Sequence, residues 1–142
     1  ETALKRLAEF KNSGDTLRIY RNGKRLFTSD KGSLLPLIDY ISHFDTSIPV
    51  IMLDKVLGNA AALLAVKAGA KQVYTPLGSQ YAFNTLGFYK IDCFFESTIA
   101  YILNYSNIDI CPMEKLSLNK DPETFFKAIK KLLLPYNTNG SG

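Results

Sequence analysis

Hydrophobic and polar residues alternate along this chain with two different periods. Residues 2–12 carry apolar side chains at helical spacing, and Gly14 follows the end of this stripe. Residues 16–29 instead alternate around Asn22-Gly23, the strongest short signal for a hairpin turn, because both positions accept a positive φ. We therefore predict a first helix followed by a β-hairpin.

The two-residue turn sets the predicted register of the hairpin. It places Ile19 opposite Leu26 on one face and Tyr20 opposite Arg25 on the other. Gly32 then interrupts the pattern, and Ser33 is a suitable N-cap for a helix. We expect that helix to continue to residue 44.

Strands and helices alternate in the middle of the chain. The pattern predicts a strand over 48–53, a helix over 56–68, a strand over 72–75, a turn at 76–78, a helix capped by Ser79, and a strand over 91–95. Residues 96–107 fit neither period. The helix after Lys55 is apolar almost all round, so we expect it to be the buried central helix.

The last predicted helix begins at Asp121-Pro122-Glu123, where a capping aspartate precedes a proline at the first helical position. The tail over 136–142 is polar and rich in glycine, so we predict a single domain over 1–135 and a disordered tail. A hairpin followed by alternating helices and strands indicates an α/β fold with one mixed sheet and helices on both faces.

Composition narrows the class of protein. The chain has 142 residues, 46% of them hydrophobic and 21% charged, which is typical of a soluble globular domain. No apolar run approaches the roughly 20 residues of a membrane helix. Two cysteines without a secretion signal indicate free thiols, so we expect a cytoplasmic protein. The net charge of +4 is too small to indicate nucleic acid as a partner.

The metal-ligating residues of the chain do not form a zinc motif. His43 is the single histidine, and Cys93 and Cys111 are far apart in sequence. A catalytic zinc ion usually needs three protein ligands, and a serine triad needs a histidine in the site. We therefore expect no metal and no cofactor, and we interpret His43 as a residue near a helix C-terminus.

The predicted helix starts near residues 56 and 79 both follow parallel strands. Their free N–H groups then open at the same sheet edge, where they favour a phosphate or carboxylate. We predict a binding site there for a small anionic or nucleotide-like ligand, with these ligand-binding residues: Asp54, Lys55, Gly58, Asn59, Ser79 and Cys111. The alternative is that Asp54 caps the helix and the small residues serve packing alone.

Two other interpretations remain open. Proline in Cys111-Pro112-Met113-Glu114 forces an extended turn, so Cys111 and Glu114 are candidate catalytic residues, with Cys111 as a nucleophile or redox thiol. The alternative there is an inert thiol. The basic hairpin over 16–29 is a candidate surface for nucleic acid or protein, although cation–π pairs within the hairpin explain the same residues.

Several motifs together resemble an uncharacterised bacterial family of domains of unknown function with a cytidine-deaminase-like fold. They are the hairpin turn Asn22-Gly23, the segment 32–37, the segment 54–62, Val73-Tyr74-Thr75 with Ser79 and Ala82, and Cys111-Pro112-Met113-Glu114. The resemblance covers residues 3–134. It implies a three-layer α/β/α sandwich and no established activity.

The resemblance also indicates where zinc ligands would stand in this sequence. In true deaminases, H-x-E begins the second core helix and P-C-x-x-C begins the third. The corresponding segments here, 54–61 and 76–81, contain neither histidine nor cysteine. In this family a basic residue is common where Asn59 stands. The resemblance therefore implies a domain without zinc-dependent deaminase activity. We rank ligand binding first, a Cys111 enzyme second and an interaction module third.

Overall fold

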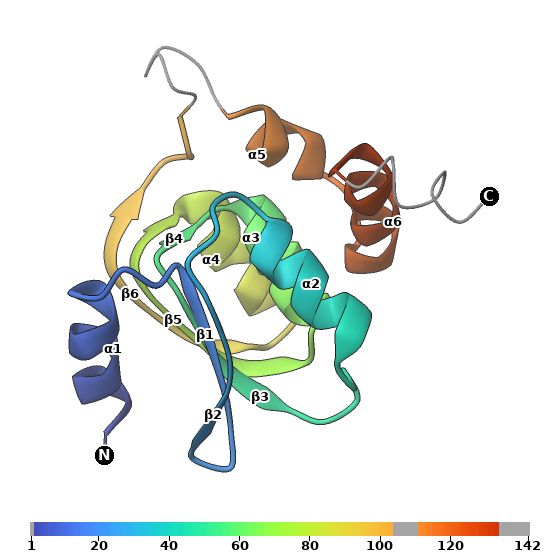
Figure 1. The fold of residues 1–142 in the computed structure, drawn as a ribbon. Helices are drawn as coiled ribbons and strands as arrows, with labels where there is room; N and C mark the ends of the chain where they lie inside the picture. The colour runs from blue at the N-terminus through green and yellow to red at the C-terminus, as the bar shows by residue number, and fades with distance from the viewer. Residues whose placement is uncertain (1, 104–110, 134–142) are drawn as a thin grey trace.

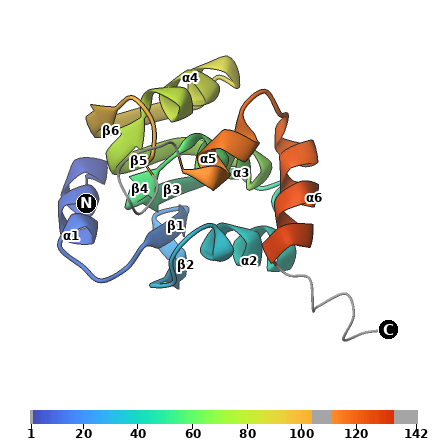
Figure 2. The same cartoon turned by 90° about the horizontal axis from the view of Figure 1, so that it is seen from above.

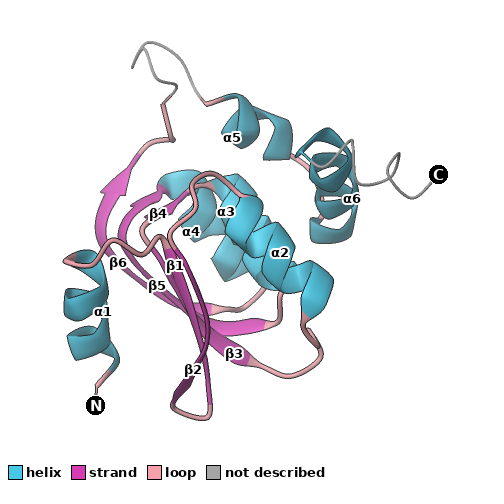
Figure 3. Ribbon diagram, viewed as in Figure 1, coloured by secondary structure: helices cyan, strands magenta, loops and turns pink. Residues whose placement is uncertain are grey.

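The computed structural model describes residues 2–103 and 111–133. Within these ranges it contains six helices and a mixed sheet of six strands (Figures 1 and 3). The helices are α1 (Ala3–Lys11), α2 (Leu35–His43), α3 (Asn59–Lys67), α4 (Gln80–Phe88), α5 (Pro112–Ser117) and α6 (Pro122–Leu133). The strands are β1 (Leu17–Arg21), β2 (Lys24–Ser29), β3 (Val50–Asp54), β4 (Val56–Leu57), β5 (Ala70–Ser79) and β6 (Asp92–Ile99).

The sheet is antiparallel at one end and parallel at the other. β1 pairs antiparallel with both β2 and β3, whereas β3, β4 and β6 run parallel to β5. β3 pairs with the first half of β5 and β4 with its second half, so these two strands form one sheet position that is broken at Lys55. The predicted mixed sheet is therefore confirmed, and β5 is an interior strand with β3 and β4 on one side and β6 on the other.

The hairpin turn is confirmed, but part of the predicted register is wrong. Tyr20 pairs with Arg25 as expected, whereas Ile19 pairs with Phe27 rather than with Leu26. The register shifts between Ile19 and Tyr20, because β2 contains one extra residue there. Turn chemistry fixes the pairs next to the turn, but it does not reveal a bulge farther along the strands.

The predicted turn at residues 76–78 is wrong, because these residues belong to β5. Pro76 has no N–H for a sheet hydrogen bond, and its place in the register explains why the strand tolerates it. β3 pairs with β5 as far as Tyr74, and β4 pairs from Leu77 onward. Pro76 therefore faces the break between the two strands, where no donor is needed. The Thr75 hydroxyl accepts a hydrogen bond from the Leu77 N–H at 3.2 Å across this position.

The start of the central helix also differs from the prediction. Val56 and Leu57 continue the sheet as β4, and α3 begins at Asn59 with Gly58 as its N-cap. Asp54 therefore ends β3 and does not cap the helix. Leu57 is fully buried, so burial of its side chain under α2 and α3 favours continued strand pairing over an earlier helix start.

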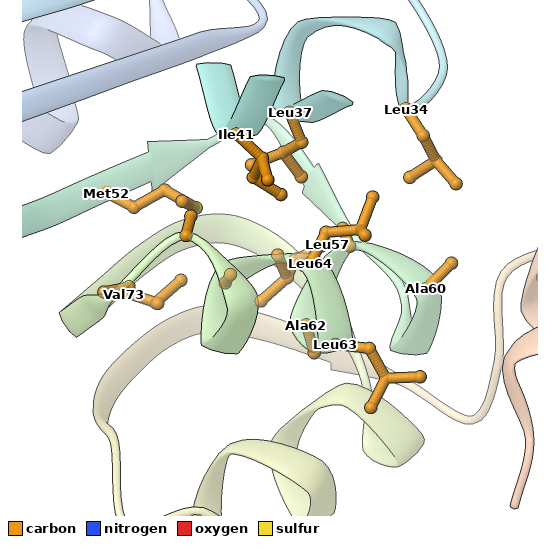
Figure 4. Packing of buried hydrophobic residues seen from close by; sticks show 14 of the residues in the cluster. Leu34, Leu37, Ile41, Met52, Leu57, Ala60, Ala62, Leu63, Leu64 and Val73 are labelled. Atoms are coloured by element: carbon orange, nitrogen blue, oxygen red, sulfur yellow. The ribbon is translucent and has the colours of Figure 1, made fainter. Parts of the chain in front are cut away.

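The two faces of the sheet bury different helices. α1 packs Leu7 and Phe10 against Tyr20 and Leu53 on one face, and Figure 2 shows it standing apart from α2, α3, α5 and α6. The other face carries the main core, in which α3 lies under α2 and beside α4 (Figure 4). The prediction that the helix after Lys55 is the buried central one is confirmed, since all but two of its nine residues are buried.

The remaining element boundaries follow local chemistry. Asp121 caps α6, because its carboxylate accepts hydrogen bonds from the N–H and hydroxyl of Thr124 at 2.8 and 2.9 Å. Ser33 does not cap α2; it has a φ of +61°, and the helix begins at Leu35. Residues 96–99 extend β6. Residues 104–107 and the predicted tail over 136–142 lie outside the described part of the chain.

None of the helices in the described ranges has the length and apolarity that crossing a membrane requires.

A matched pair of glycine substitutions tests the backbone conformation after α3. Gly69 has a φ of +84°, and a Cβ there would lie 2.4 Å from the Thr46 carbonyl oxygen. We expect Gly69→Ala to lower the free energy of unfolding by at least about 2 kcal/mol in urea titrations. Gly87 lies in α4 with no atom near its added Cβ, so Gly87→Ala should raise it by about 0.5–1 kcal/mol. Equal effects of the two substitutions would contradict this interpretation.

Candidate functional site

The two predicted helix starts lie side by side at one edge of the sheet. Leu57 of β4 pairs with Gly78 of β5 in parallel register. The next residues along the chain, Gly58 and Ser79, are the N-caps of α3 and α4. The expectation that both helices begin at the same edge is therefore confirmed.

Ser79 uses its side chain within its own helix. It is fully buried, and its hydroxyl oxygen accepts a hydrogen bond from the Ala82 N–H at 3.0 Å. Gly78 lies against the ring of Phe95, so closely that a Cβ would come within 2.3 Å of the ring. The start of α4 is thus closed by packing, and Ser79 serves as a helix cap rather than as a ligand group.

The start of α3 is occupied by a carboxylate of the chain itself. Glu114, in the first turn of α5, accepts a hydrogen bond from the Asn59 N–H, which is the first of the helix. Its other oxygen accepts the Ile102 N–H at 2.8 Å. The side chain is 2% exposed. The negative group that a helix N-terminus favours is therefore supplied from within, 55 residues away in the sequence.

Gly58 allows this carboxylate to approach. A Cβ on Gly58 would lie 2.9 Å from Glu114 Oε1 and 2.8 Å from Ile102 Cγ1. Its φ of −93° is open to any residue, so the close contact, and not backbone strain, explains the glycine. The predicted ligand-binding role of Gly58 is thus replaced by a contact with Glu114.

The side chain of Asn59 belongs to a buried polar network. Its amide nitrogen donates to the Ser117 hydroxyl at 2.9 Å and to the Ser117 carbonyl oxygen at 3.3 Å, and its amide oxygen accepts from the Thr85 hydroxyl. The Ser117 hydroxyl in turn donates to the Glu114 carbonyl oxygen at 2.6 Å. Because Asn59 is 4% exposed and bonded at both ends of its amide, it links α3 to α4 and α5.

A hollow of about 210 Å³ lies beside the start of α3. Its walls are mostly apolar, with side chains from β4, from the first turn of α3 and from residues near α5: Val56, Ala60, Ala61, Ile102 and Met113. Glu114 and Cys111 also line it. The structure therefore brings together three of the predicted site residues in its lining, namely Gly58, Cys111 and Glu114, and the N–H of Asn59 is bonded to Glu114.

Asp54 has an unusual electrostatic environment at the end of β3. Burial raises the pKa of its carboxyl to about 7, and hydrogen bonds from the N–H groups of Val56 and Lys55 oppose that rise. Asp54 as a whole is half-buried, and a raised carboxyl pKa at a strand end is one feature that functional sites share.

Lys55 lies on the other face of the sheet. Its ammonium donates to the Ser13 carbonyl oxygen at 2.6 Å and lies 5.0 Å from the centroid of the Phe10 ring. Both contacts are with α1 or the residues after it. The structure therefore does not bring the Lys55 ammonium together with the helix starts; at the break between β3 and β4 this side chain contacts α1 and the residue Ser13 after it.

Cation–π contacts surround Tyr20 of the hairpin. The guanidinium group of Arg25, in the hairpin, lies 5.9 Å from the centroid of the Tyr20 ring, and that of Arg6, in α1, lies 4.5 Å from it. Tyr20 is 6% exposed, so its ring is covered and does not present a face to a nucleic-acid base. These contacts favour the interpretation of the hairpin as a structural element supported by cation–π pairs.

The described residues contain no group of three or more His, Cys, Asp or Glu side chains that is placed to hold a metal ion. His43 is the last residue of α2, as its predicted position near a helix C-terminus required. Its Nδ1 lies 2.8 Å from the Asp39 carbonyl oxygen.

The sequence does not predict two residues of the Asn59 network, namely Thr85 and Ser117. Neither stands in a recognisable motif, because each acts through a partner that is distant in the sequence. The sequence singles out Glu114, three residues after Cys111, but does not indicate its partner at the start of α3. Helical spacing and capping rules describe contacts within one element, whereas this network joins three.

Removing the charge of Glu114 tests its role at the start of α3. We expect Glu114→Gln to lower the free energy of unfolding by about 1–3 kcal/mol, since one buried N–H loses its acceptor and the helix terminus loses its anion. Urea titration at neutral pH measures this. Glu123→Gln is the matched control, because Glu123 also lies in a first helical turn but is exposed; its effect should stay within about 1 kcal/mol. A larger effect at Glu123 would contradict the assignment.

The raised pKa of Asp54 predicts a pH-dependent stability. The folded state holds the Asp54 proton up to a pH of about 7, whereas the unfolded state releases it near pH 3.9. Stability from this group is therefore present at low pH and falls as pH rises from about 4 to 7. Asp54→Asn should exceed the native protein in stability at pH 8, by at most about 4 kcal/mol, with the difference vanishing near pH 4.

Unfolding titrations across this pH range measure the effect of Asp54→Asn. The exposed Asp30→Asn is the control and should leave the pH profile unchanged. A constant difference between Asp54→Asn and the native protein at all pH values would show that the proton is not involved.

Comparisons with known proteins agree with one another over most of the chain. No curated protein matches. A solved structure does: a crystal structure of a DUF1893 family protein (TM1506) from Thermotoga maritima, which is 25% identical, has a TM-score of 0.80, and matches over 89% of this chain and 86% of that one. The model of the family described as "Domain of unknown function (DUF1893)" matches residues 5–133. The chain therefore belongs to the DUF1893 family.

Proposed function

We propose that the hollow beside the start of α3 binds a small, uncharged molecule that donates N–H hydrogen bonds, such as a nucleobase. The observation that carries this proposal is the position of Glu114. Glu114 lines the hollow, and its carboxylate accepts the first N–H of α3. Each carboxylate oxygen has acceptor capacity beyond its one N–H bond, so a ligand donor has a partner there.

The same carboxylate argues against the anionic ligand that the sequence predicts. A phosphate at the start of α3 would have to displace Glu114 or lie beside its negative charge, which is unfavourable in a buried site. Lys55, the expected cation, contacts α1 instead. We therefore retain the ligand-binding hypothesis and change the chemical class of the ligand from anionic to uncharged.

The size and lining of the hollow support a ligand of one ring. At about 210 Å³ it is smaller than the roughly 300–1,000 Å³ of sites for drug-sized molecules. Side chains such as Val56, Ala61 and Met113 offer apolar surface to the faces of a flat ring. A nucleobase without its sugar and phosphate suits this combination of apolar walls and one carboxylate.

We further infer that the fold is a cytidine-deaminase-like α/β/α sandwich. The antiparallel hairpin beside parallel strands, the helices on both faces and the adjacent starts of α3 and α4 support this. In true deaminases the corresponding helix starts carry the zinc ligands. Here Glu114 contacts one start and Ser79 caps the other, so we propose binding without deamination.

Thermal and chemical unfolding with a panel of compounds tests the proposal. Cytosine, uracil, adenine and guanine form one arm, and inorganic phosphate and nucleoside monophosphates form the other. A nucleobase at 100 times its dissociation constant should stabilise the protein by about 2.7 kcal/mol. Val56→Phe fills the hollow and should abolish the effect, whereas Ile48→Phe, at a similarly exposed apolar residue in the loop before β3 and outside the hollow, should not. Stabilisation by phosphate alone would contradict the proposal.

Alkylation of Cys111 gives an independent measurement and separates the enzyme alternative. In a Cys93→Ser background, a nucleobase bound in the hollow should slow the reaction of the Cys111 thiol with iodoacetamide, because Cys111 is part of the wall. A nucleophilic role instead requires alkylation that stays fast well below pH 8. Fast alkylation at low pH that no nucleobase slows would favour the Cys111 enzyme.

A further inference from the structure

A second and larger hollow lies on the other side of Asn59. It measures about 520 Å³ and is formed by α3, α4 and the residues between α5 and α6. This volume falls within the range of small-molecule sites. The first hollow is lined by Glu114, which accepts the backbone N–H of Asn59, whereas the second is lined by Asn59 together with its side-chain partner Thr85.

The floor of the second hollow is held in one arrangement. The amide of Asn59 is bonded to Ser117 and to Thr85, and Leu63 beneath it is 2% exposed. The Thr85 hydroxyl donates its hydrogen to Asn59, which leaves its oxygen lone pairs as acceptors. A ligand would therefore meet a floor that needs no rearrangement, which lowers the entropic cost of binding.

An aromatic ring stands at the rim. Phe88 is 77% exposed, and its ring meets that of Tyr89 edge to face with centroids 4.9 Å apart. Both residues line the hollow. A ring that is fixed by a neighbour and open to solvent offers a ready surface for stacking.

Amide groups accompany this ring. Asn84 and Asn119 are exposed at the rim. The oxygen of Asn84 accepts from Gln80 at 2.9 Å, and its amide nitrogen has no partner among the described residues. An amide offers both donors and acceptors, which suits hydroxyl groups because each hydroxyl donates and accepts as well.

The two charged residues of the hollow are already engaged. The Lys120 ammonium donates to the Leu116 carbonyl oxygen at 2.7 Å, and the Asp121 carboxylate caps α6 through Thr124. The two side chains also carry charges of opposite sign. The hollow therefore offers no clustered positive charge for a phosphate or carboxylate, and it favours an uncharged ligand.

We propose that this hollow binds a neutral sugar, with the apolar face of one pyranose ring against Phe88 and its hydroxyl groups toward Asn84, Thr85 and Asn119. Sugars combine an apolar C–H face with many hydroxyl groups, which matches an exposed aromatic ring beside amides. The site is separate from the one proposed at the start of α3, and it does not depend on a ligand there.

Titration of the full chain with neutral sugars, followed by amide chemical shifts, tests the proposal. Glucose, galactose, mannose, N-acetylglucosamine and maltose are the probes. We expect at least one of them to give saturable shifts in α4 and around residues 119–121, with a dissociation constant of about 1 mM or below. The absence of saturation by all five up to about 10 mM would overturn the proposal.

Two phenylalanines of α4 provide a matched pair. Phe88→Ala should weaken sugar binding about tenfold, a loss of about 1.4 kcal/mol, and it should fold normally because the ring is exposed. Phe83→Ala removes a ring that contacts Phe95 outside the hollow, and it should change sugar binding less than about twofold. Asn84→Ala should also weaken binding.

Three other outcomes would overturn the assignment. The first is sugar binding that Phe88→Ala leaves unchanged. The second is saturable binding at Phe88 by nucleosides with none by sugars. The third is sugar binding that Val56→Phe in the first hollow removes while Phe88→Ala does not.

Discussion

The contact between the Glu114 carboxylate and the first N–H of α3 organises the edge of the sheet where α3 and α4 begin. It holds α5 against the central helix, requires a glycine at position 58, and fixes the Ile102 N–H after β6. A helix N-terminus attracts anions, and here the chain supplies the anion itself. The helix start that sequence patterns assign to an external phosphate is therefore occupied by the protein's own acid, with an apolar space beside it.

A second constraint comes from the break between β3 and β4. β3 pairs with β5 before Lys55 and β4 pairs with it after Lys55, whereas Lys55 itself is unpaired with β5. The side chains next to the break therefore lie in different surroundings. Asp54 ends β3 in a position where burial raises its pKa, and Lys55 contacts α1. Pro76 lies in the interior strand β5 opposite this break, so its missing N–H leaves no carbonyl of a paired strand without a donor. The break between β3 and β4 thus accounts for the positions of Asp54, Lys55 and Pro76.

The sequence predicts those features of the fold that depend on neighbours along the chain. Asn22-Gly23 forms its turn, Ser79 and Asp121 cap their helices, and the small apolar residues after 58 form the buried helix. It does not predict the start of α3, because the pairing of β4 with β5 outweighs helix propensity at Val56 and Leu57. Nor does it predict the partner of Glu114, because a hydrogen bond across 55 residues leaves no periodic signal.

Asn59 joins the two hollows that we propose as binding sites. Its backbone N–H is held by Glu114, which lines the first, and its side chain is held by Thr85, which lines the second. Ser117 links the same two residues, because its hydroxyl accepts from the Asn59 amide and donates to the Glu114 carbonyl oxygen. A displacement of Glu114 would therefore disturb α5, then Ser117, and then the floor of the second hollow. One buried hydrogen-bond network therefore borders both hollows.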